Sequence, residues 1–209
     1  IKLMINFKII LNVLGYLLIA LSLVMLIPML IDLGIGNDTW KSFITSAVIT
    51  FGFGFTFLIS TRNEANDKIL MQDAFLITSL SWLSISIFAA LPFYFSENNL
   101  DITNSIFESM SGITTTGSSV IQNVEILTEG MLIWRGLLQW IGGIGIIVMA
   151  VSILPVLRVG GMQVFRAESS DTTDKILPRT TQIASAVILI YLILSLICLV
   201  AYWFCGMNF

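Results

Sequence analysis

Residues 101–120, DITNSIFESMSGITTTGSSV, decide how this chain folds, because they are too apolar for a solvated loop and too short for a membrane span. Asp101 is a good helix N-cap, and apolar residues follow it at helical spacing as far as Ile113. A helix over 102–113 would be about 18 Å long, roughly half the hydrocarbon core of a bilayer. Three β-branched threonines before Gly117 favour an extended strand over a continued helix. The segment therefore predicts a short helix followed by an extended stretch.

Long apolar blocks surround this segment. Hydrophobic residues make up 56% of the 209 residues and charged residues 11%, whereas about a quarter of a soluble domain is charged. Each block must be helical, because lipid cannot satisfy exposed backbone amides. We therefore expect an all-α integral membrane protein, a multi-spanning helical bundle surrounded by membrane lipid. The five predicted spans cover residues 9–31, 42–60, 74–96, 136–157 and about 180 onward.

The distribution of lysine and arginine predicts the orientation. One set of connections carries most of these residues, and the opposite set has only Lys41 and Arg135. The positive-inside rule then places the N-terminus in the cytoplasm of a multi-pass protein of the inner (plasma) membrane. We expect Arg135 to extend toward the outer interface. The net charge of −3 gives no indication of a nucleic-acid partner. The inner set is Lys2, Lys8, Arg62, Lys68, Arg158, Arg166, Lys175 and Arg179.

The order span, short helix, extended segment, span is what a re-entrant pore helix and filter loop require. Irregular backbone at membrane depth is tolerated only where it is buried or lines a water-filled cavity. Inward-facing carbonyl oxygens can replace the water shell of a cation, and glycine allows the unusual dihedrals that this needs. The negative end of the short helix also favours a cation. The interpretation is therefore a cation-selective pore loop.

Several features of the loop leave alternatives open. Thr-Thr-Thr-Gly at 114–117 is equally consistent with a frayed helix end in an outer loop. Glu108 could hydrogen-bond the filter backbone from behind or lie in water at the outer vestibule. The glycines at 142, 143 and 145 could allow close approach of the pore loop or a bend, but we favour ordinary small-residue packing between membrane helices.

The chain also contains the beginning of a repeat. The third and fifth spans both follow a charged stretch and both end in aromatic residues. One loop cannot encircle an ion, and carbonyl rings come from about four loops, so we expect a longer chain with four units. The predicted organisation is an N-terminal helical pair (1–68), a first span–pore-loop–span unit (69–157), a cytoplasmic loop (158–179) and the first span of an incomplete second unit (180–209).

Three stretches carry a family resemblance: FESMSGITTTGSSV (107–120), WRGLLQWIGGIGIIVMAVSIL (134–154) and PVLRVGGMQVFRAES (155–169). They resemble the N-terminal portion of the TrkH membrane subunits of the Trk/Ktr/HKT superfamily. The resemblance implies potassium uptake through a pseudo-fourfold pore, and glycine at the filter position, where sodium-admitting relatives have serine, argues for potassium. It implies backbone carbonyls as ligands of the potassium ion, from Thr115 and Thr116, with Thr114 and Gly117 adjoining and Glu108, Gly112 and Ser118 in support.

The resemblance also implies partners. These are a second copy of the full-length chain, forming a homodimer, and a cytoplasmic nucleotide-binding regulatory subunit of the TrkA type. The loop from Arg158 to Arg179 lies on the predicted side for that subunit, although a basic interfacial elbow explains it equally well.

Other functions are less consistent with the sequence. A secondary transporter with a re-entrant hairpin for another small substrate would present helix N-termini to an anion, whereas the short helix here presents its C-terminal end. An intramembrane enzyme is disfavoured, because the chain has no histidine and no carboxylate pair within a span.

Overall fold

The computed structural model describes residues 6–61, 71–96, 100–157 and 176–206, and the chain divides into two compact units, Ile1–Gly142 and Gly143–Phe209. Every regular element in these described ranges is a helix. Five of the helical stretches are long and apolar enough to cross a membrane. The expected multi-spanning all-α class is thus confirmed. The five stretches are Phe7–Ile35, Trp40–Thr61, Gln72–Phe95, Glu129–Ile147 and Ser185–Phe204.

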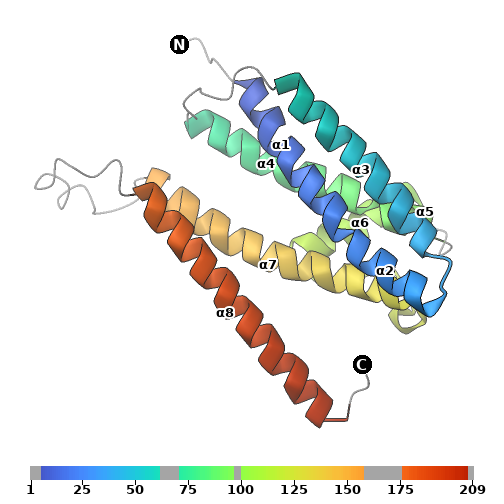
Figure 1. Ribbon diagram of the computed structural model, residues 1–209. Coiled ribbons are helices and arrows are strands. Elements are labelled where there is room, and N and C mark those ends of the chain that lie inside the picture. Colours follow the sequence, from blue (N-terminus) through green and yellow to red (C-terminus); the bar gives the residue numbers. More distant parts are fainter. Residues whose placement is uncertain (1–5, 62–70, 97–99, 158–175, 207–209) are drawn as a thin grey trace, which may run out of the picture. The chain divides into compact units, whose positions relative to one another are not determined.

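The first span is a broken helix. α1 (Phe7–Val24) and α2 (Leu26–Ile35) meet at Met25 (Figure 1). Pro28 explains the break, because proline lacks the N–H that would bond the carbonyl four residues earlier and its ring crowds that carbonyl. α2 ends at Gly36, whose φ of 94° is the left-handed C-cap conformation.

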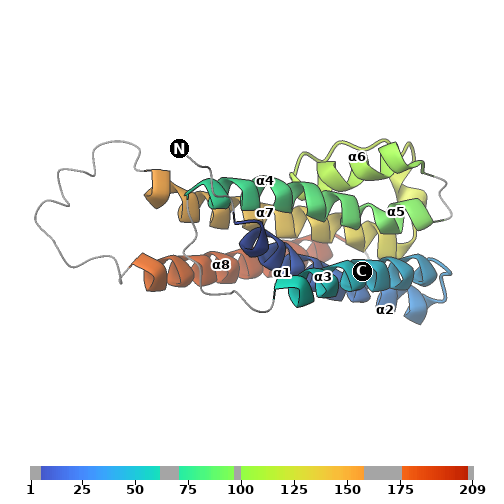
Figure 2. The same cartoon turned by 90° about the horizontal axis from the view of Figure 1, so that it is seen from above.

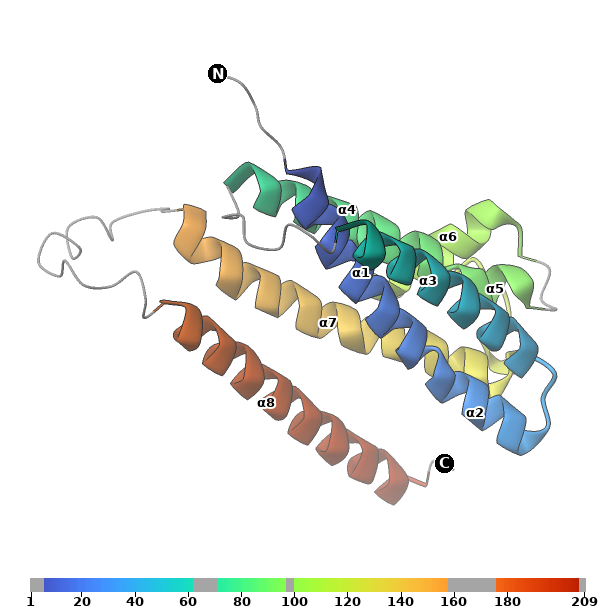
Figure 3. The ribbon, with the colours of Figure 1, turned by 45° about the horizontal axis from the view of Figure 1, so that its top comes forward.

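α3 (Trp40–Thr61) turns back and packs along α1, as Figure 3 shows. The two helices cross at Gly15 and Gly54, where a Cβ on either glycine would lie 3.0 Å from the carbonyl oxygen of the other. Small residues allow such close backbone approach between membrane helices. Near the far end of α3, Asn12 Nδ2 donates to Thr61 Oγ1 at 2.9 Å. The crossing and this bond fix the N-terminal helical pair.

The third span is also interrupted by a proline. α4 (Met71–Ala89) gives way to α5 (Leu91–Phe95) at Ala90, two residues before Pro92. α6 (Ile102–Ile113) then folds back to contact both α4 and α5, and Figure 2 shows it beside them. Asp101 caps α6 by accepting a hydrogen bond from the backbone N–H of Asn104 at 3.2 Å. The predicted short helix therefore has the predicted cap and ends.

α7 (Glu129–Leu157) follows the short 3₁₀ turn η1 (Val124–Ile126) and brings its first turns into the core of the first unit. Met131, Trp134 and Leu138 are fully buried at helical spacing. The Trp134 indole donates to the carbonyl of Ala89 at 3.1 Å, and its ring lies edge-on to Phe43, with centroids 6.2 Å apart. This core is formed by α1, α3, α4, α5, α6 and α7, and it includes Ile113, the last residue of α6 before the loop.

The second unit contains the remainder of α7 and α8 (Ile176–Phe204). The described side chains of α8 are exposed or half-exposed within this chain. Most of the predicted cytoplasmic loop, residues 158–175, lies outside the described residues. The four-segment organisation expected from the sequence remains a proposal.

Candidate functional site

The buried face of α6 is polar. Ser105, Glu108, Ser109 and Ser111 are buried, whereas Ile102 is 63% exposed and Phe107 46% exposed. Of the apolar residues whose spacing predicted the helix, only Ile113 is fully buried. In water an amphipathic helix buries its apolar stripe, but a helix within a membrane hides its polar groups inside the protein. The burial pattern of α6 is therefore the reverse of the one expected for an amphipathic helix in water.

The segment after α6 is not the extended strand that the sequence predicted. The backbone N–H groups of Thr114, Thr115, Thr116 and Gly117 fold back onto the last carbonyls of the helix, at distances of 2.9 to 3.3 Å. A helix leaves its last carbonyls without partners, and these amides satisfy them as a C-cap does. Because the last carbonyls of α6 need N–H donors, the threonines turn back toward the helix and do not form an extended strand. The acceptors are Met110, Ser111 and Gly112.

Two residues of this segment have left-handed backbone conformations. Gly117 has φ +77° and Thr115 has φ +57°, which is uncommon for a β-branched residue. Successive carbonyls of a regular strand point to opposite sides, so left-handed residues at alternate positions change where these carbonyls point. Sequence analysis expected unusual dihedrals only where glycine allows them, and it missed Thr115.

The carbonyl oxygens of Thr114 to Gly117 are available to a ligand. No hydrogen bond among the described residues ends on them, although all four N–H groups of the same residues are bonded. Thr115, Thr116 and Gly117 are exposed in this chain. The Thr114 hydroxyl donates to the Met110 carbonyl at 2.7 Å and lies 2.8 Å from the Thr116 hydroxyl, which braces the segment. The result is a row of carbonyl dipoles that can attract a cation.

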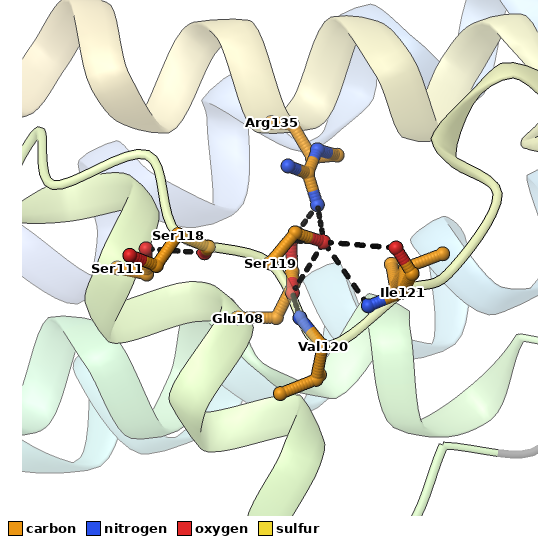
Figure 4. A network of polar contacts seen from close by, with 7 residues as sticks. All are labelled: Glu108, Ser111, Ser118, Ser119, Val120, Ile121 and Arg135. Carbon is orange, nitrogen blue, oxygen red and sulfur yellow. Dashed lines mark hydrogen bonds and ion pairs between the residues drawn. The ribbon is translucent and has the colours of Figure 1, made fainter.

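Glu108 holds the loop from behind, as Figure 4 shows. Its carboxylate accepts from the Val120 N–H and from the Ser119 hydroxyl, each at 3.1 Å, and it pairs with Arg135. Ser111 Oγ donates to the Ser118 carbonyl at 2.5 Å. Of the two positions considered for Glu108, the structure has the one behind the loop backbone and not the open vestibule.

Arg135 has a partner that was not predicted from the sequence. Its side chain is only 15% exposed, and it forms an ion pair with Glu108 while donating to Ser119 Oγ at 3.2 Å. Isolated charges near the apolar part of a membrane are costly, so an acid on the short helix and a base at the start of the next span are a signal for such pairing. The pair was not predicted from the sequence.

A small pocket brings together the predicted supporting residues. All three of these residues, Glu108, Gly112 and Ser118, line it beside Gly117, together with residues that were not predicted from the sequence. The additional lining residues are Ser111, Arg135 and Gln139. In the described ranges no group of three or more His, Cys, Asp or Glu side chains is placed to hold a metal ion.

Glycines let α6 and α7 approach closely below the loop. A Cβ on Gly142 would overlap the Ile113 carbonyl, 2.7 Å from its carbon, and a Cβ on Gly112 would lie 3.1 Å from Leu138 Cβ. The contact at Gly142 is of the kind favoured from the sequence, small-residue packing between helices, since Ile113 is the last residue of α6.

Comparison with known proteins gives consistent matches. The TrkH family model, described as a cation transport protein, matches residues 41–208. The Trk system potassium uptake protein TrkI of Halomonas elongata is 41% identical over 95% of this chain and 40% of its own length. TrkH of Escherichia coli K12 is 39% identical over 97% of this chain and 42% of its own length.

A solved structure agrees with these sequence matches. The crystal structure of the potassium transporter TrkH from Vibrio parahaemolyticus superposes with a TM-score of 0.84 at 35% identity, over 98% of this chain and 41% of that one. The chain therefore spans about two-fifths of the length of the relatives that it matches.

Proposed function

This chain belongs to the TrkH family of cation transport proteins, and on that premise we propose that it forms the front portion of a potassium uptake pore. In this proposal α6 is a re-entrant pore helix, and the backbone carbonyls of Thr115 and Thr116, with those of Thr114 and Gly117 adjoining, coordinate a potassium ion. Glu108, Gly112 and Ser118 support the loop. The ion is the transported substrate.

One observation carries the proposal: in residues 114–117, directly after α6, all four N–H groups are bonded, whereas no hydrogen bond among the described residues ends on the four carbonyls. A potassium ion must lose its hydration water in a filter, and carbonyl oxygens replace that water. The C-terminal end of α6 adds its negative partial charge at the same place. Since α6 presents this end, and not its N-terminus, to the loop, the geometry disfavours a hairpin that binds an anionic substrate.

The charges behind the loop favour a monovalent ion. Glu108 is the buried carboxylate nearest the carbonyls, and Arg135 neutralises it. Divalent cations such as Ca²⁺ are usually bound by charged carboxylates together with neutral oxygens. With the carboxylate paired, the ion faces neutral dipoles, whose weaker field is sufficient for potassium.

The remaining parts of the pore are proposed from the family. One loop cannot surround an ion, so we infer three further units in the full-length protein, arranged with pseudo-fourfold symmetry. We propose a homodimer in the inner membrane, with a cytoplasmic N-terminus and a cytoplasmic nucleotide-binding subunit of the TrkA type. The Lys and Arg residues of the inner connections support this orientation.

The test uses the full-length protein in potassium-uptake-deficient cells. Gly117→Ser places a side chain on a residue with φ +77°, and the nearest atom to its Cβ, Gln139 Nε2, is 3.9 Å away. Space is therefore adequate, and the effect comes from the backbone, which is strained by about 1–2 kcal/mol. We expect rubidium uptake to become several-fold more sensitive to competing sodium.

Gly206→Ser is the matched control. Gly206 also has a positive φ, +88°, and no atom lies within 4 Å of a Cβ there, so the same type of strain is placed outside the loop. We expect wild-type selectivity for this variant. Unchanged selectivity in Gly117→Ser, at normal protein abundance, would contradict the role assigned to the loop.

A further inference from the structure

Asp32 is a fully buried carboxylate near the end of α2, and it binds a segment far away in the sequence. Its Oδ1 accepts from the backbone N–H of Gly130 at 2.9 Å, across a separation of 98 residues, and from Asn37 Nδ2 at 3.1 Å. Its Oδ2 accepts from the hydroxyls of Thr39 at 2.5 Å and Thr128 at 3.4 Å. Asp32 thus joins the α2–α3 connection to the start of α7.

These contacts argue against a cation site at Asp32. An ionised carboxylate has about four lone-pair positions, and four donors already occupy them. The carboxylate is instead an N-cap supplied from another helix. Gly130 is the second residue of α7, and its N–H is one of those that a helix leaves without an internal partner. A negative charge at this end also complements the helix dipole.

The cap holds α7 in one position along its axis. A Cβ on Gly130 would lie 2.5 Å from Asp32 Cγ, so only glycine allows this approach. Glu129, the first residue of α7, makes a second contact with the α2–α3 connection, since its carboxylate accepts a hydrogen bond from Asn37 Nδ2 at 2.7 Å. Arg135 follows Gly130 by about 7.5 Å along the helix, at 1.5 Å per residue. Any axial shift of α7 therefore moves the guanidinium that holds Glu108.

We propose that Asp32 is a positioning residue for the filter loop. The N-terminal helical pair, which precedes the pore unit, then determines the geometry of the loop through a single buried carboxylate. The connection runs from Asp32 to the first turn of α7, from there to Arg135, and from Arg135 to Glu108 and Ser119 behind the carbonyls. The expected effect on ion selection rests on the function proposed above, whereas the effect on the loop itself does not.

The first measurement is hydrogen–deuterium exchange on the full-length protein in lipid nanodiscs, read at the peptide that covers residues 114–121. Asp32→Ala should increase amide exchange there by about tenfold, since the loop opens locally more often. Asp32→Asn keeps an oxygen acceptor for Gly130 and should give a smaller increase. Asp38→Ala is the control, because Asp38 lies in the same connection but is exposed and pairs with Lys41. It should leave the loop unchanged.

The second measurement is rubidium uptake with competing sodium, normalised to the amount of protein in the membrane. Asp32→Ala should lose selectivity several-fold, Asp32→Asn should retain part of it, and Asp38→Ala should match the wild type. A cap that only stabilises the fold would lower abundance and leave selectivity as it was, and that result would overturn the proposal.

Gly130→Ala provides an independent variant if Asp32→Ala does not accumulate, because its Cβ displaces the carboxylate from the other side. Wild-type exchange at 114–121 in both Gly130→Ala and Asp32→Asn would overturn the proposal. If Asp32→Ala exchanges faster at 114–121 but the wild-type protein takes up no cation, the positioning role is supported and the proposed uptake function is refuted. The failure of the positioning role and the failure of the proposed function are therefore distinguishable.

Discussion

Replacing Glu108 with glutamine removes one partner of the ion pair behind the loop while it preserves side-chain volume. The side chains of Glu108 and Arg135 are 2% and 15% exposed, so the pair is largely removed from water. Removing one partner of a buried pair costs about 3–5 kcal/mol, because the remaining charge is buried without compensation. The glutamine can keep one oxygen acceptor for Val120 or Ser119 but not the charge that binds the guanidinium.

That cost translates into a large change in the population of the native loop. At 1.4 kcal/mol per factor of ten, a cost of about 3–5 kcal/mol lowers the population of the native loop, relative to its open form, by a factor between about a hundred and a few thousand. We expect Glu108→Gln to lose most rubidium uptake per molecule of protein in the membrane. Glu125→Gln is the control, because Glu125 is exposed in η1 and such a surface change is usually within about 0.5 kcal/mol.

A double-mutant cycle separates the pair from other effects of Glu108. In Glu108→Gln/Arg135→Gln neither charge is left unpaired, so the double variant should lose less than the two single variants together, with a coupling of about 0.5–3 kcal/mol. The assay is rubidium uptake together with fluorescence size-exclusion of the full-length protein. Equal uptake in Glu108→Gln and Glu125→Gln, or strictly additive losses in the cycle, would refute the bracing role of the pair.

Two further predictions concern glycines at close helix contacts. Gly142→Ala should push α7 off the Ile113 carbonyl and lower uptake at a cost of about 1–3 kcal/mol, whereas Gly136→Ala on the same helix, with no atom within 4 Å of its Cβ, should be tolerated. Gly54→Ala should weaken the contact with α1 and reduce the thermal stability of the purified protein by a similar amount. Gly52→Ala is the control, because no atom lies within 4 Å of a Cβ there. Equal melting temperatures of the two variants would contradict the close crossing of α1 and α3.

Local sequence signals were sufficient to predict the short helix α6 and one of the residues that support the loop. Asp101 and the helical spacing after it predicted the limits of α6. The position of Glu108 on a half-length helix made it a candidate before its partners were known. These predictions depend on capping and periodicity, which act over a few residues.

Long-range partners were not predictable in the same way. The pairing of Arg135 was not predicted because its neutralising partner is 27 residues away on another helix, and Asp32 gave no local signal for its bond to Gly130. The burial of the polar face of α6 also depends on what surrounds the helix, which its spacing alone does not specify. Each difference arises from tertiary contacts that override local preference.

The end of α6 and the candidate ion ligands are chemically one feature. A helix must end with carbonyls that lack internal partners, and here the amides of residues 114–117 satisfy those of Met110, Ser111 and Gly112. Each of these peptide groups uses its N–H on the helix, and its orientation then determines where its carbonyl can point. The carbonyls of Thr114, Thr115 and Thr116 share their peptide planes with the bonded N–H groups of the next residues, so their directions depend on the helix end. The Ser111 backbone carbonyl accepts two of these amides, and its hydroxyl donates to the Ser118 carbonyl beside Gly117. Ser111→Ala keeps the first contact and removes the second, so we expect it to affect ion selection although the side chain coordinates no ion in this arrangement.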